Sequence, residues 1–170
     1  ARLDDASFYW QIDLSISLKQ ALAKTETITY HQQLGSISQK AIRLERLADQ
    51  LALLMTELIT PEQQDQLISA AKHCKLDLGL KVVDEFPETQ GIIGGHYCRH
   101  LEFPEPICQA IAEHYLPTSS NSPLPETTLG KLLALIDRLD HVTGFFAIDK
   151  KPTGSKDPFA IRGAALGIIN

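Results

Sequence analysis

The sequence lacks a long apolar run and has few aromatic residues and few cysteines. No stretch of about 18 apolar residues is present, so we expect no transmembrane helix, and the charged start, residues 1–5, is not followed by the apolar segment of a secretory signal. Aromatic residues make up only 6% while Leu, Ile and Ala are abundant, which favours packed helices over a β-sandwich. Cys74, Cys98 and Cys108 contain no C-x-x-C pair. We therefore expect buried thiols in a reducing, cytoplasmic compartment rather than a disulfide frame or a zinc ribbon.

Net charge and chain length limit the possible binding partners and the number of domains. The formal net charge is -5, so the chain as a whole does not attract nucleic acid, and any such binding must come from local basic patches. A chain of 170 residues with 44% hydrophobic residues can bury one core. We therefore predict one domain covering residues 1–170.

Helical periodicity runs through nearly the whole chain, and it predicts an all-α fold. Thr60, Pro61 and Gln63 form a capping box with proline at the first helical position. Gly91 and Gly95 lie on one helical face, where a second helix could approach closely. The predicted helices cover 4–14, 17–25, 37–58, 61–74, 76–85, 87–101, 104 or 106 to 115, 126–147 and 159–169. We expect an extended connector at 27–30, a loop at 116–125 and a turn at 149–156.

The segment 152–162 resembles a phosphate-binding loop at first sight. A Walker A loop needs lysine directly after its last glycine and a hydroxyl residue after the lysine. Here Ser155 precedes Lys156 and Asp157 follows it, so nucleotide hydrolysis is a poor interpretation. The segment is better interpreted as a turn, in which Asp157 caps a helix that begins at Pro158.

Candidate metal ligands are present but poorly spaced. His96 and His100 are four residues apart, yet Tyr97 stands where a zincin has its glutamate. Metal-dependent phosphohydrolases of the HD type gather a helix-borne His, an adjacent His-Asp pair and a distant Asp in a helical core.

In this chain the adjacent pair is broken, because His73 and Asp77 are four residues apart with Lys75 between them. A lysine there would oppose a divalent metal. We therefore predict no metal and no catalytic residues. The alternative hypothesis is a metal-dependent phosphohydrolase that uses His31, His73, Asp77 and Asp137.

Basic residues gather in two places, and regularly spaced cations suit contacts with phosphates. One group follows a helical strip and the other lies near the C-terminal end. The alternative is a solvated face, since Glu45 and Asp49 share the first helix. The candidate phosphate contacts are Lys40, Arg43, Lys150, Lys151, Lys156 and Arg162.

Several motifs in a fixed order resemble the bacterial glycyl-tRNA synthetase β subunit. Tyr30–Ser36, followed by Lys40 and Arg43, is similar to the F-H-x-x-L-G…K…R stretch of that family, and Glu85–Gly91 reads E-F-P-E-T-Q-G. Pro152–Ala160 reads P-T-G-S-K-D-P-F-A. Further matching segments are 75–78, 92–94, 113–117, 137–140, 144–146 and 161–168, and departures are Ile93 for Met, Cys98 for Ala and Gly163 for a second arginine.

The resemblance implies an internal fragment of a longer β subunit with an HD-like, all-helical fold. It implies an α2β2 enzyme that charges tRNA-Gly, in which the α subunit carries the ATP, Mg²⁺ and glycine sites and this fragment holds no cofactor. The partners implied are the α subunit, the rest of the β subunit and tRNA. The six cations above are then candidate tRNA contacts. A purely architectural spacer between neighbouring domains is the other possibility.

Overall fold

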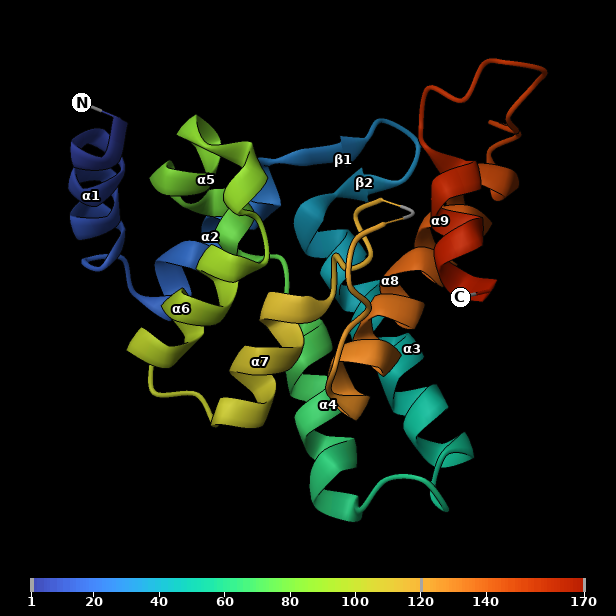
Figure 1. Ribbon diagram of the computed structural model, residues 1–170, viewed down its shortest axis with the longest axis horizontal. Helices are drawn as coiled ribbons and strands as arrows, with labels where there is room; N and C mark the ends of the chain where they lie inside the picture. Colours follow the sequence, from blue (N-terminus) through green and yellow to red (C-terminus); the bar gives the residue numbers. More distant parts are fainter. Residues whose placement is uncertain (1, 120, 170) are drawn as a thin grey trace.

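The computed structural model describes residues 2–119 and 121–169, and the fold of this part is all-α, as predicted (Figure 1). Two short segments pair as a small antiparallel sheet, and two of the helices, labelled η, are 3-10 helices. Across the described ranges, no helix combines the length and the apolar character needed to cross a membrane. The elements are α1 (Arg2–Asp13), α2 (Leu18–Thr27), β1 (Thr29–His31), β2 (Gly35–Ser36), α3 (Ile37–Leu54), α4 (Pro61–His73), η1 (Leu76–Gly79), α5 (Lys81–Glu85), η2 (Pro87–Thr89), α6 (Ile92–His100), α7 (Glu105–Glu113), α8 (Thr128–Ala147) and α9 (Ile161–Ile169).

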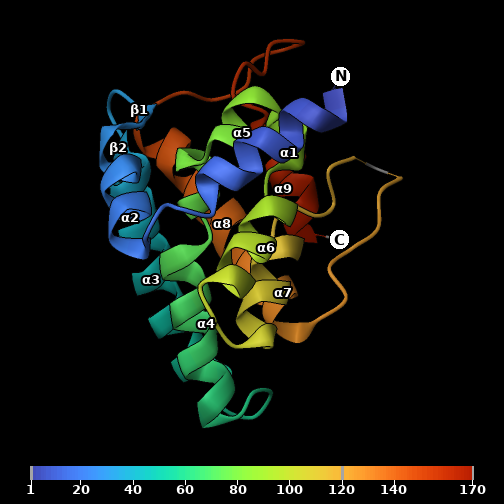
Figure 2. The ribbon, with the colours of Figure 1, turned by 90° about the vertical axis from the view of Figure 1, so that its left-hand side faces the viewer.

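The main core lies between four helices. α3 and α4 run side by side and extend below the rest of the molecule in both views (Figures 1 and 2). They pack with α7 and α8, and the fully buried residues at this junction include Leu44, Leu67, Ile111 and Leu133. A smaller core around Tyr97 joins α6, η1 and α2, and α9 packs along α8. α8 is therefore enclosed by helices on several sides, which places its polar residues in the interior.

Capping boxes start three of the described helices, and the one at Thr60 is the box that the sequence predicts. The Thr60 hydroxyl accepts a hydrogen bond from the Gln63 amide at 3.2 Å, and the Gln63 side chain accepts one from the Thr60 amide at 2.9 Å. Ser17 and Ser36 make the same reciprocal pairs at the starts of α2 and α3. α3 ends at Leu54 rather than at 58, because the chain turns at Met55. These helix starts depend only on residues three apart, which is why they are predictable.

Two predicted helices are interrupted, and part of a predicted connector forms a strand. The segment 76–85 divides into η1 and α5, because the Asp13 carboxylate accepts hydrogen bonds from the amides of Lys81 and Val82 and so starts a new helix there. The segment 87–101 breaks at Gly91, whose φ of 79° lies in the left-handed region. The predicted extended connector at 27–30 is extended at Thr29 and Tyr30, which belong to β1 and pair with β2, whereas Thr27 still belongs to α2.

The start of the last helix was predicted wrongly, although its cap was predicted correctly. The Asp157 carboxylate accepts hydrogen bonds from the amides of Ile161 and Arg162, both at 2.9 Å. The helix begins at Ile161 rather than at Pro158, because Ala160 has a φ of 52° and does not continue a right-handed helix. The predicted turn at 149–156 is present, closed by backbone hydrogen bonds between Thr153 and Lys156.

Gly95 allows α6 and α7 to approach closely, as its predicted helical face suggests. A Cβ at this position would lie 2.8 Å from the Cys108 carbonyl oxygen and 2.9 Å from the Ala112 Cβ. We expect Gly95→Ala to lower the free energy of unfolding by about 1–3 kcal/mol through overpacking. Gly163→Ala is the matched control, since its Cβ meets open space and should raise stability by roughly 0.5–1 kcal/mol. Urea unfolding would measure both, and equal effects would contradict the packing argument.

Candidate functional site

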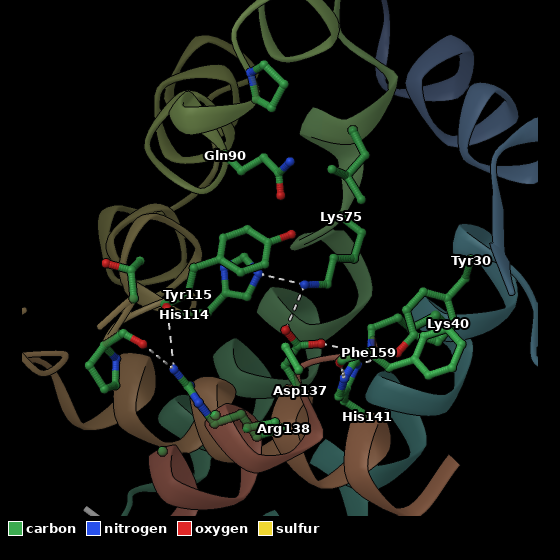
Figure 3. Close-up of a pocket in the computed structure, with 18 of the residues that line it drawn as sticks. Tyr30, Lys40, Lys75, Gln90, His114, Tyr115, Asp137, Arg138, His141 and Phe159 are labelled. Carbon is green, nitrogen blue, oxygen red and sulfur yellow. Dashed lines mark hydrogen bonds and ion pairs between the residues drawn. The ribbon is translucent and has the colours of Figure 1, made fainter. Parts of the chain in front are cut away.

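A cavity of about 730 Å³ opens between α8, α9, the segment around Gln90 and the loop that follows Tyr115 (Figure 3). β1 contributes Tyr30 to its wall, and α8 contributes Asp137 and His141. Titratable side chains gather in its lining, among them Lys40, Lys75, His114 and Asp137. It is therefore the candidate functional site, and its chemistry depends on how these groups are paired.

Lys75 lies at the floor of the cavity, and its ammonium group is fully occupied. Nζ donates a hydrogen bond to Asp137 Oδ2 at 2.8 Å and another to His114 Nε2 at 2.9 Å. The ammonium also lies 4.1 Å from the centre of the Tyr115 ring. An ammonium has three N–H donors, and here each of them faces an acceptor or an aromatic ring. Lys75 therefore has no free donor for a ligand.

Lys40 and Arg43 are paired in the same network, contrary to their prediction as phosphate contacts. Lys40 Nζ lies 2.9 Å from Asp137 Oδ1 and 2.8 Å from Asp140 Oδ2, and its side chain is only 4% exposed. Arg43 donates to Asp140 Oδ1 at 2.6 Å and to a backbone carbonyl of the preceding turn. Helical spacing places both cations on one strip, but the structure turns that strip toward α8. Lys40 and Arg43 are therefore structural cations.

The ion pairs fix the protonation states at the floor. Burial alone would raise the pKa of Asp137, but the ammonium groups of Lys75 and Lys40 hold it well below its usual range. Burial and the neighbouring Lys75 lower the pKa of His114 to about 3. A neutral imidazole fits the geometry, because Nε2 accepts from Lys75 while Nδ1 donates to the Ile111 carbonyl at 2.6 Å.

The residues of the alternative metal site do not converge. The His31 ring packs against Phe159, with ring centres 5.6 Å apart, and the His73 ring packs against Phe103 in the connection between α6 and α7. Asp77 is buried and accepts a hydrogen bond from the Gly91 amide at 2.7 Å. Within residues 2–119 and 121–169, no three His, Cys, Asp or Glu side chains are placed to hold a metal ion. The positive charge beside Asp137 comes from lysines, so the residues present do not fit a divalent metal.

The other four predicted cations lie together on an exposed turn. We call residues 149–162 the basic hairpin, which projects from the top right of the molecule in Figure 1. Lys150, Lys151, Lys156 and Arg162 are all exposed. Lys151 pairs with Asp149 at 3.0 Å between exposed groups, a contact that water screens strongly. The Arg162 guanidinium donates to the Gly154 carbonyl and so holds the turn together.

Sequence reasoning missed Arg138, which organises one wall of the cavity. Its guanidinium donates to the carbonyls of Leu116 and Pro117 at 2.7 and 3.1 Å, and also to those of Tyr115 and Ala134. These bonds hold the loop after α7 against α8. The available signal was a lone arginine on an apolar helix. The loop carbonyls that it binds lie 21–23 residues away, and the sequence does not indicate them.

Comparison with known proteins agrees with this arrangement of motifs. A family described as "Glycyl-tRNA synthetase beta subunit" matches residues 1–170. The chain is 42% identical over 170 residues to a glycine–tRNA ligase beta subunit of Thermodesulfovibrio yellowstonii, covering 100% of the chain and 24% of the relative. It is 44% identical over 169 residues to that of Acidithiobacillus ferrooxidans, and 39% identical over 171 residues to that of Listeria monocytogenes, in each case covering 99% of the chain and 24% of the relative. The chain thus spans about a quarter of the length of these relatives. It belongs to the family of glycyl-tRNA synthetase beta subunits.

Proposed function

We propose that this chain is an HD-like domain of a glycine–tRNA ligase β subunit, and that it contacts tRNA and supports the structure without catalytic residues of its own. Family membership supports the assignment to the ligase. The observation that carries the tRNA contact is the basic hairpin, in which four exposed cations lie within 13 residues, Lys150 to Arg162. A projecting strip of cations suits an RNA backbone, because each can neutralise one phosphate.

The cavity supports a domain without chemistry of its own. The carboxylates that could act as acids, bases or ligands are held by Lys75, Lys40 and Arg43. His114 accepts a hydrogen bond from Lys75 and is buried, so it has no free basic nitrogen. A general base must be able to accept a proton near neutral pH, and neither Asp137 nor His114 meets that need.

The remaining parts of the proposal concern the whole enzyme. The relatives are named glycine–tRNA ligase beta subunits, so we propose that the chain serves ATP-dependent charging of tRNA with glycine. In this proposal an α subunit carries the ATP, Mg²⁺ and glycine sites. The α subunit, the rest of the β subunit and tRNA-Gly are the partners of the domain.

Charge reversal on the basic hairpin tests the tRNA contact. In the full-length enzyme, we expect Lys150→Glu, Lys151→Glu and Lys156→Glu together to weaken tRNA-Gly binding by about 10- to 100-fold at low salt. The slope of log affinity against log salt should become shallower by about two to three, as phosphate contacts are lost. Filter binding over a NaCl series would measure both. Arg162 is left intact because it holds the turn.

A matched triple variant separates local contact from net charge. Lys19→Glu, Lys81→Glu and Lys131→Glu change the charge equally at exposed sites outside the hairpin. These substitutions should leave the salt slope as in the wild type. If the hairpin variant keeps both wild-type affinity and slope, the tRNA contact is refuted. The remaining hypothesis would then be an architectural spacer. In that case deleting the domain would reduce tRNA charging, whereas substituting its surface cations would not.

A further inference from the structure

The cavity keeps a polar and aromatic lining after its ion pairs are formed. The floor contains the cations Lys75 and Lys40 and the carboxylate of Asp137, while Asp140 pairs with Lys40 and Arg43 outside the lining. Both lysines are engaged with carboxylates, and they outnumber the single carboxylate of the floor, which disfavours a cationic guest. The floor therefore holds no unpaired charged group that would bind a free ion.

A neutral hydrogen-bonding group, the side-chain amide of Gln90, faces the remaining space. This amide points into the cavity above Lys75 and Tyr115 (Figure 3). The Gln90 side chain has no hydrogen-bond partner among the described residues. Asp137 Oδ1 is buried and lies 2.9 Å from Lys40 Nζ, so it belongs to the ion-pair network beneath the lining rather than to the surface that a guest would meet. The side-chain amide of Gln90 carries both a donor and an acceptor, and it can therefore pair with the mixed donor and acceptor edge of a nucleobase.

Aromatic rings complete the lining. Tyr30, Tyr115 and Phe159 border the cavity from three different parts of the chain. Phe159 stacks on Phe145 at 4.4 Å between ring centres, which fixes its orientation. Rings of this kind hold unpaired bases by stacking, which is tolerant of base identity. A volume of about 730 Å³ lies within the range of pockets that enclose a small ligand.

The basic hairpin leads directly to this lining. Its cations begin at Lys150, and Phe159 and Ala160 within the same segment border the cavity. We propose that the cavity holds one unpaired nucleotide, with the base inside and the phosphate toward the basic hairpin. This inference rests on the proposed tRNA contact, and it assigns the nucleotide to the bound tRNA.

Chemical footprinting of tRNA-Gly bound to the full-length enzyme tests the proposal. Dimethyl sulfate and carbodiimide modify unpaired bases, so a base held in the cavity should lose reactivity about tenfold in the wild-type complex. Gly163→Phe would place a ring at the cavity lining from a position with open space around its Cβ. We expect it to restore the reactivity of that base and to weaken tRNA binding about tenfold. Gln90→Leu should weaken protection while keeping the volume.

The controls distinguish this proposal from the function on which it rests. Ile169→Phe adds the same ring at an exposed position of α9 outside the cavity lining, and it should leave protection unchanged. Protection that persists in Gly163→Phe, while hairpin charge reversal still weakens binding, would overturn the cavity assignment and leave the tRNA contact standing. The four nucleoside 5′-monophosphates form a second arm. Saturable binding of one of them, without protection of any tRNA base, would overturn the assignment to tRNA and indicate a free nucleotide.

Discussion

Asp137→Asn is expected to lower the free energy of unfolding by about 3–5 kcal/mol, because it leaves two buried ammonium groups without their shared carboxylate. Asp137 bridges Lys75 and Lys40, and each of these lysine side chains is only 4% exposed. Asparagine keeps the shape of the side chain but removes its charge. Asp140 alone would then face Lys40 and Arg43, and Lys75 would keep only a neutral imidazole and a ring. Urea unfolding at neutral pH would measure the loss.

An exposed ion pair supplies the matched control. Asp149→Asn removes the carboxylate that faces Lys151 on the basic hairpin, where both side chains are more than half exposed. This change should not shift the unfolding midpoint measurably, since water screens the pair. If Asp137→Asn proves too unstable to purify, Lys75→Met with Asp137→Leu removes one lysine together with the shared charge and should be less damaging than Asp137→Asn alone. Equal midpoints for Asp137→Asn and Asp149→Asn would refute the role of the buried network.

The parts of the fold that sequence predicted depend on neighbours along the chain. The capping boxes at Ser17 and Thr60 need only a glutamine three residues later, so the local sequence is enough to identify them. The close approach at Gly95 follows from helical periodicity. The start of α5 could not be predicted, because its cap is Asp13, 68 residues earlier. Nothing in the segment 76–85 indicates that a distant carboxylate begins a new helix within it.

The same distinction separates the two groups of cations. The turn around Lys156 is polar and contains glycine and proline, so its exposure follows from local composition. Lys40 and Arg43 were predicted on a helical strip, but both pair with Asp140, about 100 residues away, and the Lys40 side chain is only 4% exposed while that of Arg43 is 32% exposed. Periodicity shows which residues share a face and leaves open whether a second charged helix covers it. For this reason tRNA contact by the basic hairpin stays a prediction, whereas Lys40 and Arg43 leave the candidate set.

Acid should weaken the fold through His114 before it affects the buried carboxylates. The pKa of this histidine falls from 6.5 to about 3 in the folded protein, because burial and Lys75 both oppose a positive charge there. Between these two values the unfolded chain binds one more proton than the folded chain, so stability falls as pH falls. The free energy of unfolding should drop by roughly 2–3 kcal/mol between pH 6.5 and pH 4.5.

The carboxylates act over a lower range of pH. The pKa values of Asp137 and Asp140 are both held below their usual range by the cations that face them. Their contribution is present above the pKa of the unfolded chain, about 4, and it is lost only as pH falls below that value. His73 and His141 also have lowered pKa values, through burial first, and they add to the loss in the same direction as His114.

His114→Gln isolates the contribution of this histidine. Glutamine keeps an acceptor for Lys75 but does not titrate, so the variant should be less stable than the wild type at pH 7 and show a shallower fall with acid. The difference in slope should be about 1.4 kcal/mol per pH unit between pH 6 and pH 4.5, which corresponds to one proton. Urea unfolding at a series of pH values measures this slope. An identical slope in both proteins would mean that the imidazole beside Lys75 is already charged in the folded state, and Lys75 would then need a different partner from the one the structure shows.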